Sequence, residues 1–452
     1  MAALLRKDLS RISRAVQVLF SMKGILRADE WKSLPPRQLL SRELRLHDNR
    51  SVFMSDAAYE SLRTIVSIIH AADVFEDNAE FSDVWSACRA VVQGCLANGV
   101  MPENGAELVA MTTEKVNPQI DEFTFVVPLE GVTLELEVLR FGVVSIVPST
   151  ADWLLANARK PTEDLAKGLA LSMKAPCWLV GSVRGTYKAA ERKIELLARL
   201  TAGLLGILAA ATYEGGAEGF RIRAVMVPED GTRSGTTLAV WSKTIQELSF
   251  ARRMAAGQPF PLDETFLKKM NSADSVVSDA IATVQRQPRN DLEEAIVKAV
   301  YWYADAHLDS IEVMRFVKFW SCIETFFPAP KNITKTVCLG ATAVLVYGPL
   351  RSIPLADYQA TKTRLTALYG LRSGAVHHAK HDHVSSRDIE ELSQWAAWLV
   401  LNVVALNKRG VSERSTLLEE CQRLDNIETR APSDPRSSKP IPPSAGTNDA
   451  SW

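Results

Sequence analysis

Residues 368–383, LYGLRSGAVHHAKHDH, bring together the side-chain types that acid–base chemistry needs. Four of the seven histidines of the chain lie within seven positions of this stretch, and Arg372 lies just upstream of them. Histidine can take or give a proton near neutral pH, because its ordinary pKa is about 6.5. Arginine adds a fixed positive charge and a planar set of donors that suits phosphate. These residue types are compatible with a metal site, a catalytic site or a solvated loop.

The metal interpretation is the least favoured of the three. His377 and His381 are four residues apart, which would place two ligands on one face of a helix. However, Gly374 is expected to bend the chain, and no cysteine or second carboxylate cluster lies close by in sequence. We therefore expect no metal and no cofactor. We expect His378 to support substrate binding or the fold, and His381 and His383 to be exposed.

The overall composition excludes few classes of function. The chain has 452 residues, 47% of them hydrophobic, and 52 basic against 53 acidic side chains give a net charge of -1. A basic surface for a polyanion must therefore be local. None of the six cysteines has C-x-x-C spacing, which favours reduced thiols in a cytoplasmic protein. The longest apolar run, residues 200–212, is too short to cross a bilayer, so we expect a buried helix and no membrane anchor.

Apolar periodicity predicts an α+β protein of several domains. A helical N-terminal region and a small mixed α/β region precede an all-α helical bundle. The expected divisions are 1–115 for the helical N-terminal region, 116–235 for the mixed domain, 236–410 for the helical domain and 411–452 for a disordered tail.

The mixed region contains three strand candidates. Alternating apolar residues cover 123–148, with a hairpin expected at Pro-Leu-Glu-Gly, and further strands are expected at 176–183 and 220–228. An apolar helix at 189–212 separates the last two strands. No Gly-rich phosphate loop follows any of these strands, so the mixed region offers no catalytic motif of its own.

Five helices are expected in the C-terminal half. Their ranges are 290–309, 310–328, 333–348, 355–372 and 385–410. Asn290, Ser310 and Ser385 or Ser386 are the expected N-caps, because their short polar side chains accept from the first-turn amides. Buried stripes are expected at Leu292, Ile296, Val300 and Tyr303 in the first helix, and at Ile389, Leu392, Ala396, Leu399 and Val403 in the last.

Glu324 lies on an apolar helix face. Steps of three and four residues place it beside Val317, Trp320 and Phe327. A carboxylate among large apolar side chains is costly unless it is paired. We therefore expect a cation or a set of donors next to Glu324, or else a helix boundary where the carboxylate reaches water.

Residues 290–410 resemble the Apea-like branch of the HEPN superfamily. The resemblance is carried by FVKFWSCIETFF, NITKTVCLGATAVL and LYGLRSGAVHH, followed by a closing apolar helix. The mark of the superfamily is an arginine, four to six residues, and a histidine. In this chain the motif is Arg372, Ser-Gly-Ala-Val, His377. The resemblance as a whole, with the flanking helices, covers roughly a quarter of the chain.

The resemblance implies a dimeric helical bundle. Many such domains are metal-independent endoribonucleases of phage defence and toxin–antitoxin systems, with two Arg-His pairs facing each other across a homodimer. Arg372 and His377 would be the catalytic residues, while Glu324, Ser373 and His378 support them. Active members often have Asn, Asp or His where this chain has Ser373. If so, residues 1–235 would sense a trigger or restrain the nuclease, and a trigger or antitoxin protein is a possible partner. The alternative is a non-catalytic dimeric HEPN module for binding or regulation.

The charge around the motif would suit RNA. The expected phosphate contacts are Lys331, Lys335, Arg364 and Lys380, within a stretch that has few acidic residues. The competing interpretation is that these are ordinary solvated helix charges.

Overall fold

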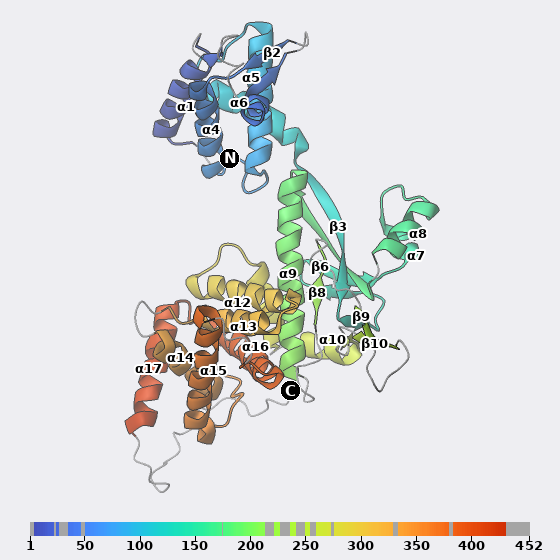
Figure 1. Cartoon of the computed structure of the whole chain (residues 1–452), viewed down its shortest axis with the longest axis vertical. Coiled ribbons are helices and arrows are strands. Elements are labelled where there is room, and N and C mark those ends of the chain that lie inside the picture. Colours follow the sequence, from blue (N-terminus) through green and yellow to red (C-terminus); the bar gives the residue numbers. More distant parts are fainter. Residues whose placement is uncertain are drawn as a thin grey trace. The chain divides into compact units, whose positions relative to one another are not determined.

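The computed structural model describes most of the chain. The described residues are 4–21, 24–26, 35–46, 50–173, 175–212, 221–226, 236–240, 249–253, 259–272, 275–328, 333–378 and 383–430. They form a mixed α+β structure that separates into two compact units (Figure 1). Unit 1 consists of residues 1–125 with 182–194, and unit 2 of residues 126–181 with 195–452.

Unit 1 is mainly helical, as the sequence predicts. Its elements are α1 (Arg6–Leu19), α3 (Pro36–Arg42), β1 (Glu43–Arg45), β2 (Ser51–Phe53), α4 (Asp56–Ala71), α5 (Phe81–Asn98), α6 (Gly105–Val116) and the 3-10 turn η2 (Asn117–Gln119). Ser55 caps α4 by accepting from the Ala58 amide. Helix α5 ends at Gly99, whose φ of 66° is readily adopted by glycine.

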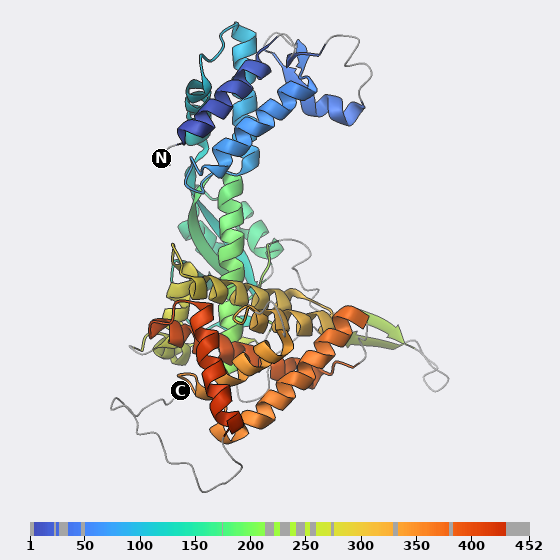
Figure 2. The same ribbon diagram turned by 90° about the vertical axis from the view of Figure 1, so that its left-hand side faces the viewer.

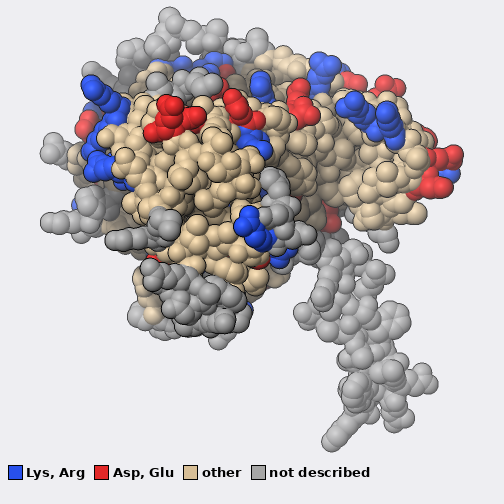
Figure 3. All heavy atoms as spheres, turned by 90° about the horizontal axis from the view of Figure 1, so that it is seen from above, with Lys and Arg blue, Asp and Glu red and all other residues tan. Residues whose placement is uncertain are grey.

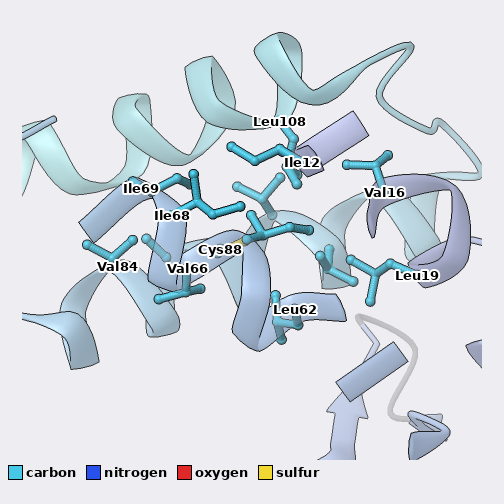
Figure 4. Close-up of a cluster of buried hydrophobic side chains, with 14 of the residues drawn as sticks. Ile12, Val16, Leu19, Leu62, Val66, Ile68, Ile69, Val84, Cys88 and Leu108 are labelled. Carbon is cyan, nitrogen blue, oxygen red and sulfur yellow. The ribbon is translucent and has the colours of Figure 1, made fainter. Parts of the chain in front are cut away.

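The core of unit 1 lies between four of these helices. Figure 4 shows side chains of α1, α4, α5 and α6 converging on one another. Ile12, Leu62, Val84, Cys88 and Leu108 are fully buried there. Their burial requires the four amphipathic helices to fold together, because no single helix can remove its apolar face from water.

The mixed sheet has the strand order β5-β6-β7-β3-β8. Its strands are β3 (Asp121–Glu130), β5 (Leu139–Phe141), β6 (Val144–Pro148), β7 (Cys177–Gly185) and β8 (Arg223–Ala224). The expected strand at 176–183 is present as β7. Helices α7 (Ala151–Asn157) and α8 (Glu163–Ser172) pack on this region, where Trp178 is fully buried and meets Trp153 edge to face.

The hairpin expected at Pro-Leu-Glu-Gly is wrong. After β3 the chain passes Gly131, which has a φ of 80°, into β4 (Val132–Leu134). Strand β4 pairs in parallel with β11 (Phe260–Leu262) instead of folding back on β3. The hairpin of this stretch forms later, between β5 and β6 around Gly142. The turn residues predicted correctly that the chain bends here. They could not predict that β4 pairs with β11, which lies far away in the sequence.

Helix α9 (Tyr187–Thr212) contains the long apolar run. It is long and apolar enough to span a membrane by composition, but 72% of its most apolar window is buried inside the structure. Leu204, Leu205 and Ile207 are fully buried. This agrees with the expected buried helix at 200–212, because a helix that is apolar on all sides is typical of a domain core.

The C-terminal helices of unit 2 follow the predicted order (Figure 2). They are α10 (Glu264–Met270), α11 (Val276–Gln285), α12 (Asp291–Leu308), α13 (Glu312–Glu324), α14 (Ile333–Tyr347), the 3-10 turn η4 (Leu355–Asp357), α15 (Tyr358–His378), α16 (Ser386–Lys408) and α17 (Arg414–Arg430), preceded by the antiparallel pair β9 (Thr236–Val240) and β10 (Ser249–Arg253).

The caps of these helices are partly as expected. Asn290 and Ser385 each form a capping box with the acidic residue three positions on. Both predicted apolar stripes of α12 and α16 are buried. The Ser310 cap is wrong, because Ile311 occupies the N-cap of α13 and no side chain caps it.

The expected tail at 411–452 is wrong for its first part. Residues 414–430 form α17, which buries Leu417 and Cys421 at the four-residue spacing of one helical face. Arg414 fixes the start of α17 through two-pronged hydrogen bonds to Asp291. This segment is highly charged, so its sequence gave little indication of a helix. Helix α17 is stable because it packs against the rest of unit 2. The remainder, 431–452, lies outside the described residues.

The division of the chain also differs from the expected one. The mixed sheet and the C-terminal helices belong to one compact unit, whereas the sequence predicted a boundary near 235. Gln285 of α11 illustrates the connection, since its side chain bonds Phe141 and Val143 in the β5–β6 hairpin. Residues 227–235, which precede the predicted boundary, lie outside the described residues.

Helix α9 approaches α12 too closely for any side chain at Gly203. A Cβ placed there would lie 2.6 Å from the Val300 carbonyl oxygen. We expect Gly203→Ala to lower the free energy of unfolding by about 1–3 kcal/mol, because the two backbones must separate. Urea unfolding followed by circular dichroism measures this loss.

Gly168 provides the matched control. It lies in α8, and a Cβ added there would have no atom within 4 Å. Gly168→Ala should raise the free energy of unfolding by about 0.5–1 kcal/mol, because alanine loses less backbone entropy in a helix. Equal destabilisation by both variants would contradict the close approach at Gly203.

Candidate functional site

The motif arginine and histidine both lie on α15. The bend expected at Gly374 is wrong, because α15 continues as helix from Tyr358 to His378. Five positions on an α-helix correspond to a rotation of about 140° and a rise of about 7.5 Å. Arg372 and His377 of one chain therefore point to different sides of the helix.

Arg372 is held by Glu324 of the neighbouring helix α13. Its Nη2 donates to Glu324 Oε2 at 3.2 Å, so the cation expected beside Glu324 is present. The guanidinium carbon also lies 5.7 Å from the centre of the Tyr369 ring. Tyr369 in turn meets the fully buried Trp320 edge to face, with ring centres 5.5 Å apart. Aromatic packing thus fixes the two helices that carry the ion pair.

The pair is only partly satisfied. Burial raises the pKa of Glu324, and the charge and hydrogen bond of Arg372 oppose that shift. Glu324 Oε1 and Arg372 Nε are both buried without a hydrogen-bond partner. The side chains are 21% and 20% exposed, so the pair lies at the edge of the core and still reaches solvent. This leaves the guanidinium with donors for a further acceptor, such as a phosphoryl oxygen.

The other motif residues are less enclosed. His377 is exposed in the last turn of α15, and Ser373 is partly buried beside Arg372 in the sequence. His378 closes the helix, and its side chain lies outside the described residues, as do His381 and its neighbours. His383 is exposed, as expected. The described residues show no contact between His377 and Arg372.

One of the expected RNA contacts is already engaged within the chain. Arg364 donates to Asp388 at 2.5 Å and to Glu391 at 2.8 Å, both on α16. These carboxylates raise the pKa of Arg364, although burial acts in the opposite direction. The contact of Arg364 with RNA that we expected would have to compete with this ion pair.

The remaining basic candidates are distributed unevenly. Lys335 is exposed at the start of α14, while Lys331 and Lys380 lie outside the described residues. Lys362 pairs with Asp425 of α17. Figure 3 views the molecule from the end where unit 1 lies in Figure 1, and on that face basic and acidic side chains are interspersed. Of the four expected phosphate contacts, Lys335 is the one that the structure describes as exposed.

A polar cavity elsewhere in unit 2 was not predicted from the sequence. It is lined by His307 of α12 and Arg315 of α13, among others. The sequence held one indication that His307 is buried, because His307 follows Tyr303 by four residues and so continues the predicted apolar stripe of α12.

No group of three or more His, Cys, Asp or Glu with metal-binding geometry occurs among the residues that the structure describes.

No protein-family model, no curated protein and no solved structure matches this chain.

The ion pair between Glu324 and Arg372 should make stability depend on pH. Arg372→Met should lower the free energy of unfolding at pH 7 by about 1–3 kcal/mol, because it strands a partly buried carboxylate. The loss of Arg372 removes the cation that opposes the upward pKa shift of Glu324. The folded variant therefore holds the Glu324 proton more tightly, and the penalty is present above the raised pKa and disappears as pH falls through it.

Urea unfolding at several pH values between 4 and 7 measures this dependence. The double variant Glu324→Leu with Arg372→Met supplies the control, since it removes both charges and should lose the pH-dependent part of the penalty. A penalty for Arg372→Met that is equal at every pH would show that the guanidinium does not stabilise the Glu324 carboxylate.

Proposed function

We propose that this chain is a metal-independent endoribonuclease of HEPN type that works as a homodimer. Arg372 and His377 are its catalytic residues, and Glu324 positions Arg372. The observation that carries the proposal is the ion pair between Arg372 and Glu324. The motif arginine keeps a fixed orientation and a partly exposed guanidinium, while the motif histidine is exposed on the same helix.

The reaction is the transesterification of RNA by its own 2′-hydroxyl. A neutral imidazole takes the 2′-hydroxyl proton, and the 2′-oxygen forms a bond to phosphorus. The bond from phosphorus to the 5′-oxygen breaks, and an imidazolium gives that oxygen a proton. The products are a 2′,3′-cyclic phosphate and a 5′-hydroxyl. The guanidinium of Arg372 stabilises the charge that develops on the phosphoryl oxygens.

Two copies of the chain explain how so short a motif performs both proton transfers. One chain supplies one motif histidine, and the helical geometry of α15 directs His377 and Arg372 to different sides. A partner chain brings a second histidine, so that one imidazole acts as base and the other as acid. The homodimer is therefore a requirement of the mechanism and is part of the proposal.

The rest of the chain has a regulatory role in this proposal. In it, residues 1–235 sense a trigger or restrain the nuclease, and an antitoxin protein is a possible partner. All six cysteines are buried free thiols, which agrees with action in the reducing cytoplasm.

A non-catalytic HEPN module is the second candidate. The observation that favours it is the engagement of basic residues around the motif, since Arg364 is paired with Asp388 and Glu391, and Lys362 with Asp425. In that case Arg372 serves the packing of α13 on α15, and the dimer binds a partner without cutting RNA.

Cleavage of RNA in the presence of EDTA tests the proposal. The purified chain should convert mixed RNAs into fragments with 2′,3′-cyclic phosphate ends. Arg372→Ala and His377→Ala should each lower the rate by about 100-fold or more, because each removes charge stabilisation or proton transfer from the transition state. Gel analysis of end-labelled RNA measures the rates.

His383→Ala is the matched control, because it removes another exposed histidine from the same stretch but outside the motif. It should cleave at the wild-type rate. Cleavage that persists equally in all three variants would identify a contaminating nuclease. Absent cleavage by a dimer that binds RNA or a protein equally well with and without Arg372 would favour the non-catalytic module.

A further inference from the structure

A small polar cavity in unit 2 has the features of an anion site. Its volume is about 220 Å³, and it lies where the start of α13, the start of α16 and the end of α12 meet the segment before β8. The basic side chains that line it are Arg221, His307 and Arg315, and Ser386 and Ser393 line its α16 side, where the Ser393 hydroxyl is hydrogen-bonded to the Tyr303 hydroxyl. These groups come from segments up to about 170 positions apart in the chain, so only the fold assembles them.

His307 is the least expected group in this cavity. It is 4% exposed, and neither of its ring nitrogens has a hydrogen-bond partner. The rings of Tyr303 and Phe319 pack against it, with centres 5.1 and 5.9 Å away. Buried polar atoms without partners are rare, because each costs the full loss of hydration. A buried and unpartnered imidazole that lines a cavity therefore indicates a ligand.

Among the described residues, the arginines of the cavity form no ion pair. No carboxylate among the described residues lies within ion-pair distance of Arg315 or Arg221, and the Nε of Arg315 is buried without an acceptor. Burial, together with the charge of Arg221, lowers the pKa of Arg315 to about 10. Burial and the same arginines lower the pKa of His307 to about 3. His307 is therefore a neutral imidazole that can donate through one ring nitrogen, and the two arginines carry the positive charge of the cavity.

The uncapped N-terminus of α13 adds to the positive character of the cavity. Glu312 and Arg315 lie in the first turns of α13, whose N-cap residue Ile311 supplies no side-chain acceptor. Ser386 is the first residue of α16, but the N-terminus of that helix is already closed by the capping box of Ser385 and Asp388. First-turn amides have no partner within their helix, and the helix dipole favours an anion beside them.

Two carboxylates also line the cavity and limit what it can hold. Glu312 is exposed and Glu390 is partly exposed, so water solvates both at the rim. The groups that lack partners in the interior are all possible donors to an anion. The inner part of the cavity is therefore rich in hydrogen-bond donors, and carboxylates lie at its opening. The donors suit one compact anion, whereas the carboxylates would repel a highly charged polyanion.

We propose that this cavity binds a phosphate group, either inorganic phosphate or the phosphate of a nucleoside monophosphate. Phosphate matches the donor set, because its oxygens accept from guanidinium, hydroxyl, imidazole and helix amides together. The volume suits a phosphate with little else enclosed, since sites for drug-sized ligands range from about 300 to 1,000 Å³. The site is distinct from Arg372 and His377 and does not depend on ribonuclease activity.

Calorimetric titration of the full chain tests this site. The probes are inorganic phosphate, adenosine 5′-monophosphate and adenosine, all at constant ionic strength. We expect the two phosphates to bind and to raise the melting temperature, and adenosine to do neither. Stronger binding of inorganic phosphate identifies the free ion as the ligand, and stronger binding of the monophosphate identifies a nucleotide.

Two variants should move the affinity in opposite directions. Arg315→Gln should weaken phosphate binding by about tenfold or more, because a charge-assisted hydrogen bond is lost. Glu312→Gln should tighten it by about two- to fivefold, because a like charge leaves the rim. Glu312 is exposed, so this variant should fold even if Arg315→Gln does not. A merely structural role for the cavity predicts no increase in affinity.

Arg409→Gln is the control for net charge, since Arg409 is an exposed arginine beyond the end of α16. It should bind phosphate as the wild type does. The proposal is overturned if neither phosphate binds, if chloride at equal ionic strength raises the melting temperature as much, or if all three variants change the affinity alike.

Discussion

The placement of one carboxylate on an apolar helix face constrains the arrangement around the motif. Glu324 ends α13 among Trp320 and other large side chains, and burial raises its pKa. A cation must lie beside it, and Arg372 of α15 fills that need. The ion pair therefore limits how far α15 can shift along α13. It also fixes the orientation of the Arg372 side chain, because the buried Glu324 carboxylate needs a cation.

Helix α13 connects the polar cavity with the motif arginine. Arg315 lies near its start in the cavity, and Glu324 ends it beside Arg372. Between them, Phe316, Phe319 and Trp320 are fully buried and hold the helix in the core of unit 2. Both polar arrangements are thus attached to one rigid apolar element, which is how a folded protein keeps sparse polar groups in defined positions.

Local rules were sufficient for much of the helical half. The caps at Asn290 and Ser385 and the stripes of α12 and α16 depend on neighbours three or four positions away, so the order of residues predicts them. The same periodicity showed that Glu324 needed a partner, and the HEPN resemblance suggested Arg372. The straight course of α15 through Gly374 was missed, because a glycine only weakens a helix that packing supports.

The sequence by itself determined most helices and their buried faces, because these follow from local spacing. It also showed that Glu324 needed a cation, a set of donors or access to water, because burying a charge is costly. Tertiary structure alone decided that β4 pairs with β11, that α17 docks through Arg414, and that Arg364 is neutralised by α16. It also decided which distant residues surround His307. Such pairings are selected by packing of the whole unit, and no short stretch of residues contains that information.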